Sequence, residues 1–175
     1  LFPCNPVGAP VAGSAASLSP LKPTDLKRYV RSHYLPQNTV AVIAGHFDES
    51  AAHDVLVRTF GRFRAGRHTV PAIVPVDFSV PPVAEVSVTK DVNQAQLALG
   101  YCSFGIHDPR KYAATVMDAI LGRGMSSRLF QEVREKRGLS YDISSRMQFF
   151  EDAGMFTVSA GLDRTKTAKA LSTID

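Results

Sequence analysis

The residues whose types and spacing best suit chemistry lie between positions 121 and 141, LGRGMSSRLFQEVREKRGLSY. A glycine-rich break opens a charged amphipathic helix, which we expect to stop at Gly138 and to pass directly into a strand headed by Tyr141. The helix carries an apolar stripe of Leu129, Phe130 and Val133. Since each helical residue advances by about 100°, Arg134 falls at the edge of that stripe. An arginine in such a place can rest its stem on the core and present its guanidinium to a groove.

Tyr141 stands at the head of the strand that follows this helix. In an extended chain it shares a face with Ile143, Met147 and Phe149, so we expect its ring to be seated on apolar neighbours with the hydroxyl at a rim. Two donors seven residues apart across one turn, Arg134 and Tyr141, could converge on a single oxygen atom. The residues alone leave a second interpretation open, in which the helix is only a solvated basic helix and the tyrosine belongs to the core.

The five histidines of the chain are candidates for metal binding. They are His33, His46, His53, His68 and His107. None stands in an H-E-x-x-H or H-x-x-E-H pair, the spacing that places two imidazoles on one zinc ion. The nearest constellation is His46, Glu49 and His53, in which Glu49 and His53 could share one face of a helix start while His46 precedes that helix. We therefore interpret it as an exposed turn with a charge pair, and expect no metal site in this chain.

Other catalytic patterns are also missing from the sequence. There is no G-x-S-x-G elbow, and neither Cys4 nor Cys102 lies in an activating context. The glycines at 122 and 124 follow a predicted helix, whereas a nucleotide-binding loop would follow a strand. By itself, the chain is not expected to hold a complete active site.

The composition is that of a soluble globular protein, with 45% of its 175 residues hydrophobic and 21% charged. No apolar run approaches the roughly 20 residues that cross a bilayer, which excludes a membrane-spanning helix. The net charge of +4 argues for solubility, and we expect no nucleic-acid partner. Two cysteines give no disulfide framework, and we expect Cys102 to be a small core residue. With no secretory hydrophobic region at the amino end, a cytoplasmic location is favoured.

Periodicity, caps and breakers predict the elements in order along the chain. Helices are expected from Pro23 to before Pro36, from Asp48 through Phe60, after Asp108-Pro109, from Ser126 to Gly138, and from Asp163 onward. Strands are expected at 39–44, 83–90, 94–103, 141–150 and 153–162, with hairpin turns at 91–93 and 152–154. The helix after Pro109 is expected to turn an apolar face towards the core, formed by Tyr112, Ala113, Val116, Met117, Ile120 and Leu121.

These elements predict an α+β fold, with a mainly antiparallel sheet of about five strands and helices packed on one face. Residues 1–21 are rich in proline, glycine, alanine and serine, which indicates an extended arm or linker. Residues 22–175 are expected to form a single domain. Because the apolar pattern of the last helix is still running at Asp175, we expect the chain to be a piece of a longer protein, truncated in that helix.

Three motifs follow one another along the chain. The first is H-Y-x-P-x-N at 33–38, and the second is A-G-x-F-D at 44–48. The third is G-x-G-M-S-S-R-L-F from Gly122, followed by R-E-K-x-G-L-x-Y from Arg134 to Tyr141. With these motifs the chain resembles the insulinase and mitochondrial processing peptidase (pitrilysin-type) family of zinc metallopeptidases. From about Leu21 to the end, it is similar to the domain that follows the zinc-binding domain of that family.

The resemblance implies a function for particular residues. Arg134 and Tyr141 would contact the substrate carbonyl and the transition state from opposite the zinc ion. A glycine-rich segment would bind substrate, here through Gly122, Gly124, Met125 and Ser126. The zinc motif and the glutamate base of the family lie upstream of this kind of domain, so zinc is implied for that upstream domain of the full-length protein and not for this chain.

The resemblance also implies partners and an activity. The full-length protein would be a zinc metalloendopeptidase, acting on unfolded peptides inside a clam-shell of similar domains. The partners would be peptide substrates and a zinc-binding domain of the same or a partner chain, with the full-length form a dimer. This chain alone would be inactive. The alternative is a non-catalytic partner or scaffold subunit of the same family, one that has no metal site.

Overall fold

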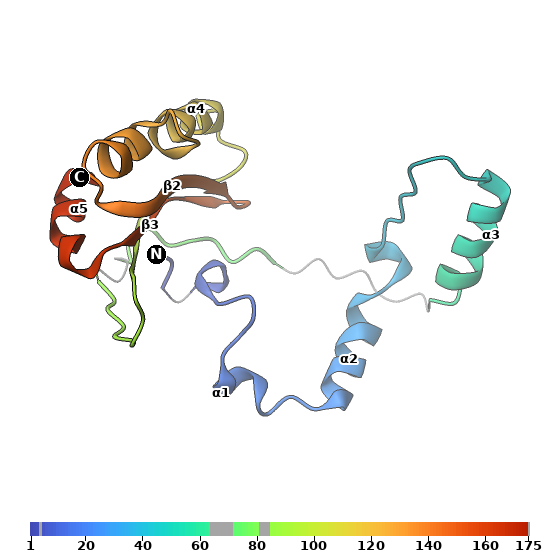
Figure 1. Cartoon of the computed structure of the whole chain (residues 1–175). Coiled ribbons are helices and arrows are strands. Elements are labelled where there is room, and N and C mark those ends of the chain that lie inside the picture. Colours follow the sequence, from blue (N-terminus) through green and yellow to red (C-terminus); the bar gives the residue numbers. More distant parts are fainter. Residues whose placement is uncertain (4, 64–71, 81–84, 175) are drawn as a thin grey trace. The chain divides into compact units, whose positions relative to one another are not determined.

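The computed structural model describes all residues except 4, 64–71, 81–84 and 175 (Figure 1). The chain forms two compact units, one of Leu1–Gly8 with Val74–Asp175 and one of Ala9–Ile73. We call them the sheet unit and the helical unit. The expected division into an arm at 1–21 and a domain at 22–175 stays a prediction.

The sheet unit is built on three antiparallel strands. They are β1 (Ala95–Phe104), β2 (Ser140–Phe149) and β3 (Ala153–Leu162), in the spatial order β1-β3-β2. The predicted hairpin at 141–150 and 153–162 is confirmed as β2 and β3, and the strand predicted at 94–103 is β1. The fold is a mixture of helix and strand as expected, but within the described residues the sheet has three strands and not about five.

Two predicted strands are wrong in the described part of the chain. Residues 39–44 and 85–90 have no regular secondary structure, while 83–84 lie outside the described residues. Val40 and Val42 are 89% and 82% exposed. A β-branched run suits a half-buried pleated surface, and it becomes a strand only when another strand pairs with it. The predicted hairpin turn at 91–93 is wrong for the same reason, since β1 pairs with β3 and not with residues 85–90.

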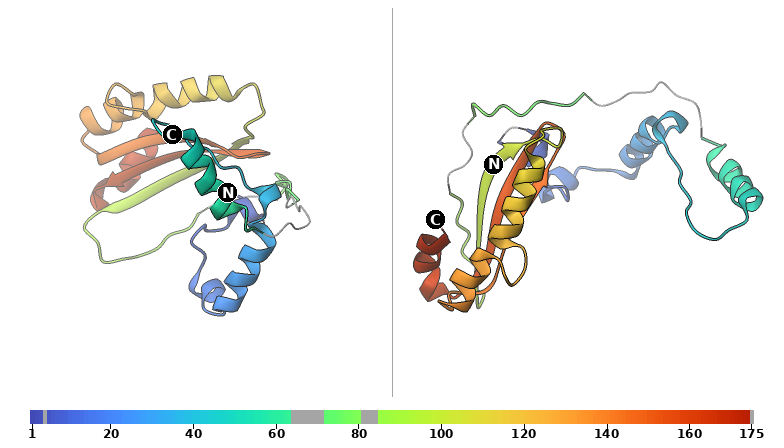
Figure 2. Two further views of the ribbon diagram at one scale, coloured as in Figure 1. Left: turned by 90° about the vertical axis from the view of Figure 1, so that its right-hand side faces the viewer. Right: turned by 90° about the horizontal axis from the view of Figure 1, so that it is seen from above.

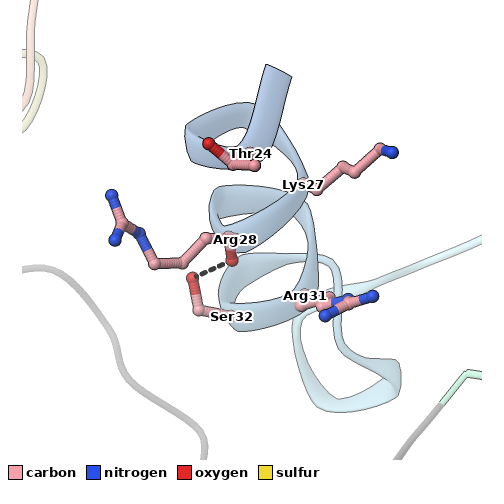
Figure 3. Close-up of a pocket in the computed structure, with 5 residues that line it drawn as sticks. All are labelled: Thr24, Lys27, Arg28, Arg31 and Ser32. Atoms are coloured by element: carbon pink, nitrogen blue, oxygen red, sulfur yellow. Dashed lines mark hydrogen bonds between the residues drawn. The ribbon is translucent and has the colours of Figure 1, made fainter. Parts of the chain in front are cut away.

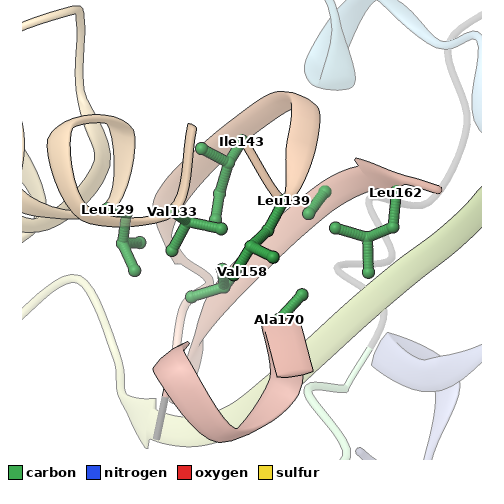
Figure 4. Close-up of a cluster of buried hydrophobic side chains, with 8 residues drawn as sticks. Leu129, Val133, Leu139, Ile143, Val158, Leu162 and Ala170 are labelled. Carbon is green, nitrogen blue, oxygen red and sulfur yellow. The ribbon is translucent and has the colours of Figure 1, made fainter. Parts of the chain in front are cut away.

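The core of the sheet unit lies where one face of the sheet meets two short helical segments (Figure 4). One is the π-helical turn η3 (Phe130–Glu135), and the other is α5 (Thr167–Ile174), which follows the 3₁₀ turn η4 (Arg164–Lys166). Asp163 caps this last helical run, as predicted, by accepting a hydrogen bond from the amide of Thr165. The buried cluster consists of Leu129, Val133, Leu139, Ile143, Val158, Ala160, Leu162 and Ala170. The predicted apolar stripe is therefore buried at Leu129 and Val133, with Phe130 half-buried.

Helix α4 (Lys111–Gly122) packs along β2, which Figure 2 shows from two directions. Its predicted core face is wrong. Tyr112, Val116 and Ile120 are 72%, 59% and 51% exposed, whereas Asp118 and Gly122 are buried. Because Gly122 has no side chain, α4 can approach the sheet closely there. The helix face that carries Gly122 therefore turns inward, and the face with large apolar side chains is exposed.

Cys102 is also not the core residue that was expected. Its side chain is exposed, and its Sγ lies 3.7 Å from the carbonyl oxygen of Leu1. Successive strand residues face opposite sides of the sheet. Leu97 and Leu99 pack against the core cluster, so Cys102 falls on the other face.

The helical unit contains α1 (Ala15–Leu18), α2 (Pro23–His33), the 3₁₀ turn η2 (Pro36–Asn38) and α3 (Glu49–Phe60). A further 3₁₀ turn, η1 (Pro6–Gly8), belongs to the sheet unit. The predicted helices from Pro23 and from Asp48 are confirmed, and Oδ1 of Asp48 accepts a hydrogen bond from the amide of Ala51 at 2.8 Å. No residue of α1, α2 or α3 is buried. Local caps and periodicity are thus enough to set these helices, without a core beneath them.

Candidate functional site

The candidate site is the corner where η3 ends and β2 begins. Gly138 takes a positive φ of 55°, the left-handed conformation predicted for it. Its amide donates to the carbonyl of Arg134 at 2.9 Å, and the amide of Leu139 donates to the carbonyl of Val133 at the same distance. Lys166 Nζ donates to the carbonyl of Gly138 at 3.1 Å. These bonds fix the backbone between the two candidate residues on either side of the corner.

Arg134 lies at the edge of the buried stripe, as expected, next to the fully buried Val133. Its guanidinium carbon is 4.8 Å from the centroid of the Phe130 ring. This cation–π contact holds the guanidinium against the Phe130 ring. Among the described residues Arg134 forms no salt bridge.

The neighbouring basic residues of this helix end differ from Arg134, because Glu132 holds them. Lys136 and Arg137 both pair with the Glu132 carboxylate, and Arg137 also donates to the Glu132 carbonyl at 2.8 Å. The hydrogen bond from Lys136, followed by that from Arg137, lowers the pKa of Glu132 to about 2. Of the three cations, Arg134 is therefore the one whose donors are free for a ligand in the described structure.

Tyr141 is not seated on apolar neighbours as expected, since its side chain is 58% exposed. The pairing of β2 with β3 shifts between Ser140 and Asp142, so Tyr141 is the extra residue of a β-bulge. A bulge breaks the two-residue alternation and re-aims a side chain. Ile143 and Met147 keep their places on the buried face, while Tyr141 leaves it. The interpretation of Tyr141 as a core residue is also wrong.

The glycine-rich turn after α4 is held in place from both ends. Gly122 lies so close to β2 that an added Cβ would come within 2.3 Å of both the amide nitrogen and the Oγ of Ser145. Gly124 has a φ of 83°, which favours glycine, and its carbonyl accepts from the amide of Ser127 at 3.2 Å. Gln131 Nε2 donates to the carbonyl of Met125 at 2.7 Å, while the Met125 side chain is 74% exposed. The turn is therefore braced and yet open to solvent.

Asp118 is a residue of this region that the sequence reasoning missed. It is fully buried at the contact between α4 and β2. One carboxylate oxygen accepts from Ser145 Oγ at 2.6 Å, and the other accepts from Arg123 Nε at 2.7 Å. A signal for it exists in the sequence. Ala114, Asp118 and Gly122 recur every four residues, which places an acid between two small residues on one helix face.

Two hollows of the described surface are lined by residues other than those of the candidate corner. One follows the exposed side of α2 and is lined by Thr24, Lys27, Arg28, Arg31 and Ser32, where Ser32 Oγ donates to the carbonyl of Arg28 at 3.0 Å (Figure 3). The other, in the sheet unit, is lined by residues that include Leu1, Phe2, Phe78 and Tyr101. Neither includes Arg134, Tyr141 or the glycine-rich turn.

The described residues contain no group of three histidine, cysteine, aspartate or glutamate side chains that could hold a metal ion. His46, Glu49 and His53 form no such group. The described residues therefore contain no set of donors that fits a zinc ion. Within the same residues, no helix has the length and apolar character needed to span a bilayer.

Comparison with known proteins places residues 20–175 in the family model described as the peptidase M16 inactive domain. An uncharacterized zinc protease from Streptomyces coelicolor is 34% identical over 174 residues, covering 92% of this chain. Another, from Bacillus subtilis, is 31% identical over 169 residues and covers 96%. The chain spans 36% and 40% of the lengths of these two relatives.

A solved structure gives the same picture for the fold. The crystal structure of a peptidase M16 inactive domain from Pseudomonas fluorescens matches with a TM-score of 0.81 and 25% identity. The match covers 99% of this chain and 42% of that one. Both kinds of comparison thus point to the same domain, and in each case to only part of a longer relative.

Proposed function

Because the chain belongs to the family of peptidase M16 inactive domains, we propose a role for it in a metallopeptidase. It would be the zinc-free, substrate-binding domain of an enzyme that hydrolyses peptide bonds in unfolded peptides. Zinc would belong to a zinc-binding domain of the same or a partner chain. The residues of this chain would act on the peptide and not on the metal.

The observation that carries this proposal is the braced corner, with two donors that have no partner within the described part of the chain. Arg134 and Tyr141 flank a backbone fixed by the hydrogen bonds of Gly138 and Leu139. Both side chains are exposed, and Arg134 is held against Phe130. A rigid placement matters because a donor stabilises developing charge best when it needs no rearrangement during the reaction.

The roles follow from the chemistry of the two side chains. The planar guanidinium of Arg134 can donate two parallel hydrogen bonds to backbone carbonyls and so orient an extended peptide. The phenol of Tyr141 can donate one hydrogen bond to the oxyanion that develops on the scissile carbonyl. The turn of Gly122, Gly124, Met125 and Ser126, in which the residues beyond the buried Gly122 are exposed, would contact the peptide beside them.

The test is peptide cleavage by the intact protein carrying Y141F or R134K. Loss of one oxyanion donor is expected to lower kcat by roughly a hundredfold. R134K keeps the charge but loses the planar fork, so it is also expected to reduce turnover. The melting temperature should stay unchanged in Y141F, because the side chain is exposed and the ring remains.

Matched controls are available in the same unit. Tyr112 is another exposed tyrosine, on α4, and Arg146 is an exposed arginine on β2. Y112F and R146K are expected to cleave as the parent protein does. Full activity in Y141F and R134K would overturn the assignment of the site. An intact protein that binds peptides and cleaves none would instead favour the non-catalytic scaffold.

A further inference from the structure

A buried carboxylate under the glycine-rich turn needs an explanation. Asp118 is 0% exposed, in a helix whose apolar side chains Tyr112, Val116 and Ile120 face solvent. Burying a charge is costly unless it is paired and hydrogen-bonded. For packing alone, an apolar residue at this position would serve better.

The partners of Asp118 show what the carboxylate holds. Ser145 Oγ donates to it at 2.6 Å and belongs to β2, so this bond ties α4 to the sheet. Arg123 Nε donates to it at 2.7 Å, and Arg123 is the first residue beyond α4. The side chain of Arg123 is 56% exposed, so its bond with the buried carboxylate connects the interior to the base of the turn.

The turn beyond this anchor has its backbone donors unused. Among the described residues, no acceptor is found for the amides of Gly124, Met125 and Ser126. The carbonyls of Gly124 and Met125 are already engaged by Ser127 and Gln131. The anchoring bonds thus hold the turn to α4 and β2, while three consecutive amides of exposed residues have no acceptor among the described residues.

We propose that Asp118 is a positioning residue, whose bonds to Arg123 and Ser145 hold the turn at 122–126 in the shape that binds an extended peptide backbone. This inference rests on the proposed function, because it assumes that the turn contacts substrate. Asp118 touches no peptide itself. It acts by limiting the conformations of the turn, which reduces the ordering that binding would otherwise require.

The test compares D118N with the double variant D118N/R123Q in the 175-residue chain. In D118N the side chain loses its charge and keeps one acceptor oxygen, so Arg123 Nε and Ser145 Oγ can no longer each donate to an oxygen of their own, and the anchor is weakened. In the double variant the side-chain oxygen introduced at position 123 can accept a hydrogen bond from the amide nitrogen introduced at position 118. A fluorescein-labelled unstructured peptide, followed by fluorescence anisotropy, is expected to bind about tenfold more weakly to D118N. The double variant is expected to recover part of this loss.

A second measurement reports on the turn without peptide. Hydrogen exchange at the buried amide of Ser127, which donates to the Gly124 carbonyl, is expected to be faster in D118N and slower again in the double variant. The matched control is R110Q, which removes the Asp108–Arg110 pair at the other end of α4. R110Q is expected to change neither the affinity nor the exchange of the turn.

The outcomes separate this inference from the proposed function. A parent chain that binds no peptide would overturn the proposed function, and with it the peptide-binding role given to the turn. A parent chain that binds peptide, with D118N binding equally well at a temperature where both are folded, would overturn the inference alone. If D118N and the double variant lost peptide affinity equally, with unchanged hydrogen exchange at the turn, Asp118 would be only a packing residue. That result would also overturn the inference.

Discussion

The helical run that leads through η4 into α5 and the helix α3 both begin at an aspartate cap, yet their surroundings differ completely. Asp163 precedes the run that leads into α5, which buries Ala170 in the core of the sheet unit. Asp48 caps α3, in which no residue is buried. The same cap chemistry thus defines a helix in both units, but only one of the two helices is stabilised by a core. Caps set where a helix starts, whereas packing sets how much the helix contributes to stability.

The largest expected difference between the units concerns a leucine truncated in each. Leu162 is fully buried in the core cluster, whereas Leu26 on α2 is 60% exposed. L162A is expected to lower the free energy of unfolding by about 2–5 kcal/mol, because it removes buried methyl groups and leaves a cavity. L26A is expected to change it by less than about 0.5 kcal/mol. Urea unfolding followed by circular dichroism measures both, and equal losses would show that the helical unit has a core of its own.

A smaller difference is expected when the two caps are removed. D163A is expected to lower the free energy of unfolding of the sheet unit by about 1 kcal/mol, the usual contribution of a cap to a packed helix. D48A is expected to leave that transition unchanged and to speed amide exchange within α3 only. A 12-residue helix without packing is close to the limit of stability in water. If D48A lowered the free energy of unfolding of the sheet unit as much as D163A does, the two units would not be separate.

The smallest effect is expected from acid, and it acts on the sheet unit. The pKa of Glu132 falls from 4.5 to about 2 through its bonds with Lys136 and Arg137. A carboxyl whose pKa is lowered by folding stabilises the fold above its ordinary pKa, and this contribution is lost as the pH falls through the folded value. E132Q is therefore expected to melt slightly lower than the parent at pH 6, with the difference vanishing between pH 4.5 and 2.

This acid effect has an internal control on the same helical segment. Glu135 is exposed and forms no salt bridge within the described residues. E135Q is expected to show the same melting temperature as the parent protein at pH 6 and at pH 2. Because Glu132 is exposed to solvent, the E132Q difference should also shrink in high salt. A difference as large at pH 2 as at pH 6 would rule out these ion pairs as its cause.

Features set by neighbouring residues could be predicted from the sequence. The β2–β3 hairpin, the caps at Asp48 and Asp163 and the left-handed stop at Gly138 all depend on short-range chemistry. The order of Arg134, Gly138 and Tyr141 across one corner was predicted for the same reason. Whether these side chains contact substrate remains a prediction.

Features that depend on distant partners could not be predicted in this way. The runs at 39–44 and 85–90 have strand-forming residues but no paired strand. Tyr141 left the buried face because β2 is bulged against β3, which no pattern within β2 reveals. Asp118 was missed because its role depends on Arg123 and Ser145, and apolar periodicity drew attention to the opposite side of its helix.

The order of the strands has a consequence for how the chain is made. The central strand, β3, is the last of the three along the chain, and β1 and β2 are each bonded to it and not to each other. During synthesis from the amino end, neither outer strand has its partner until residues 153–162 have left the ribosome. Unpaired strands with apolar faces are prone to associate with other chains. A nascent chain stopped before Ala153 would therefore expose two strands without a partner at once, and the synthesis of β3 removes this risk of association.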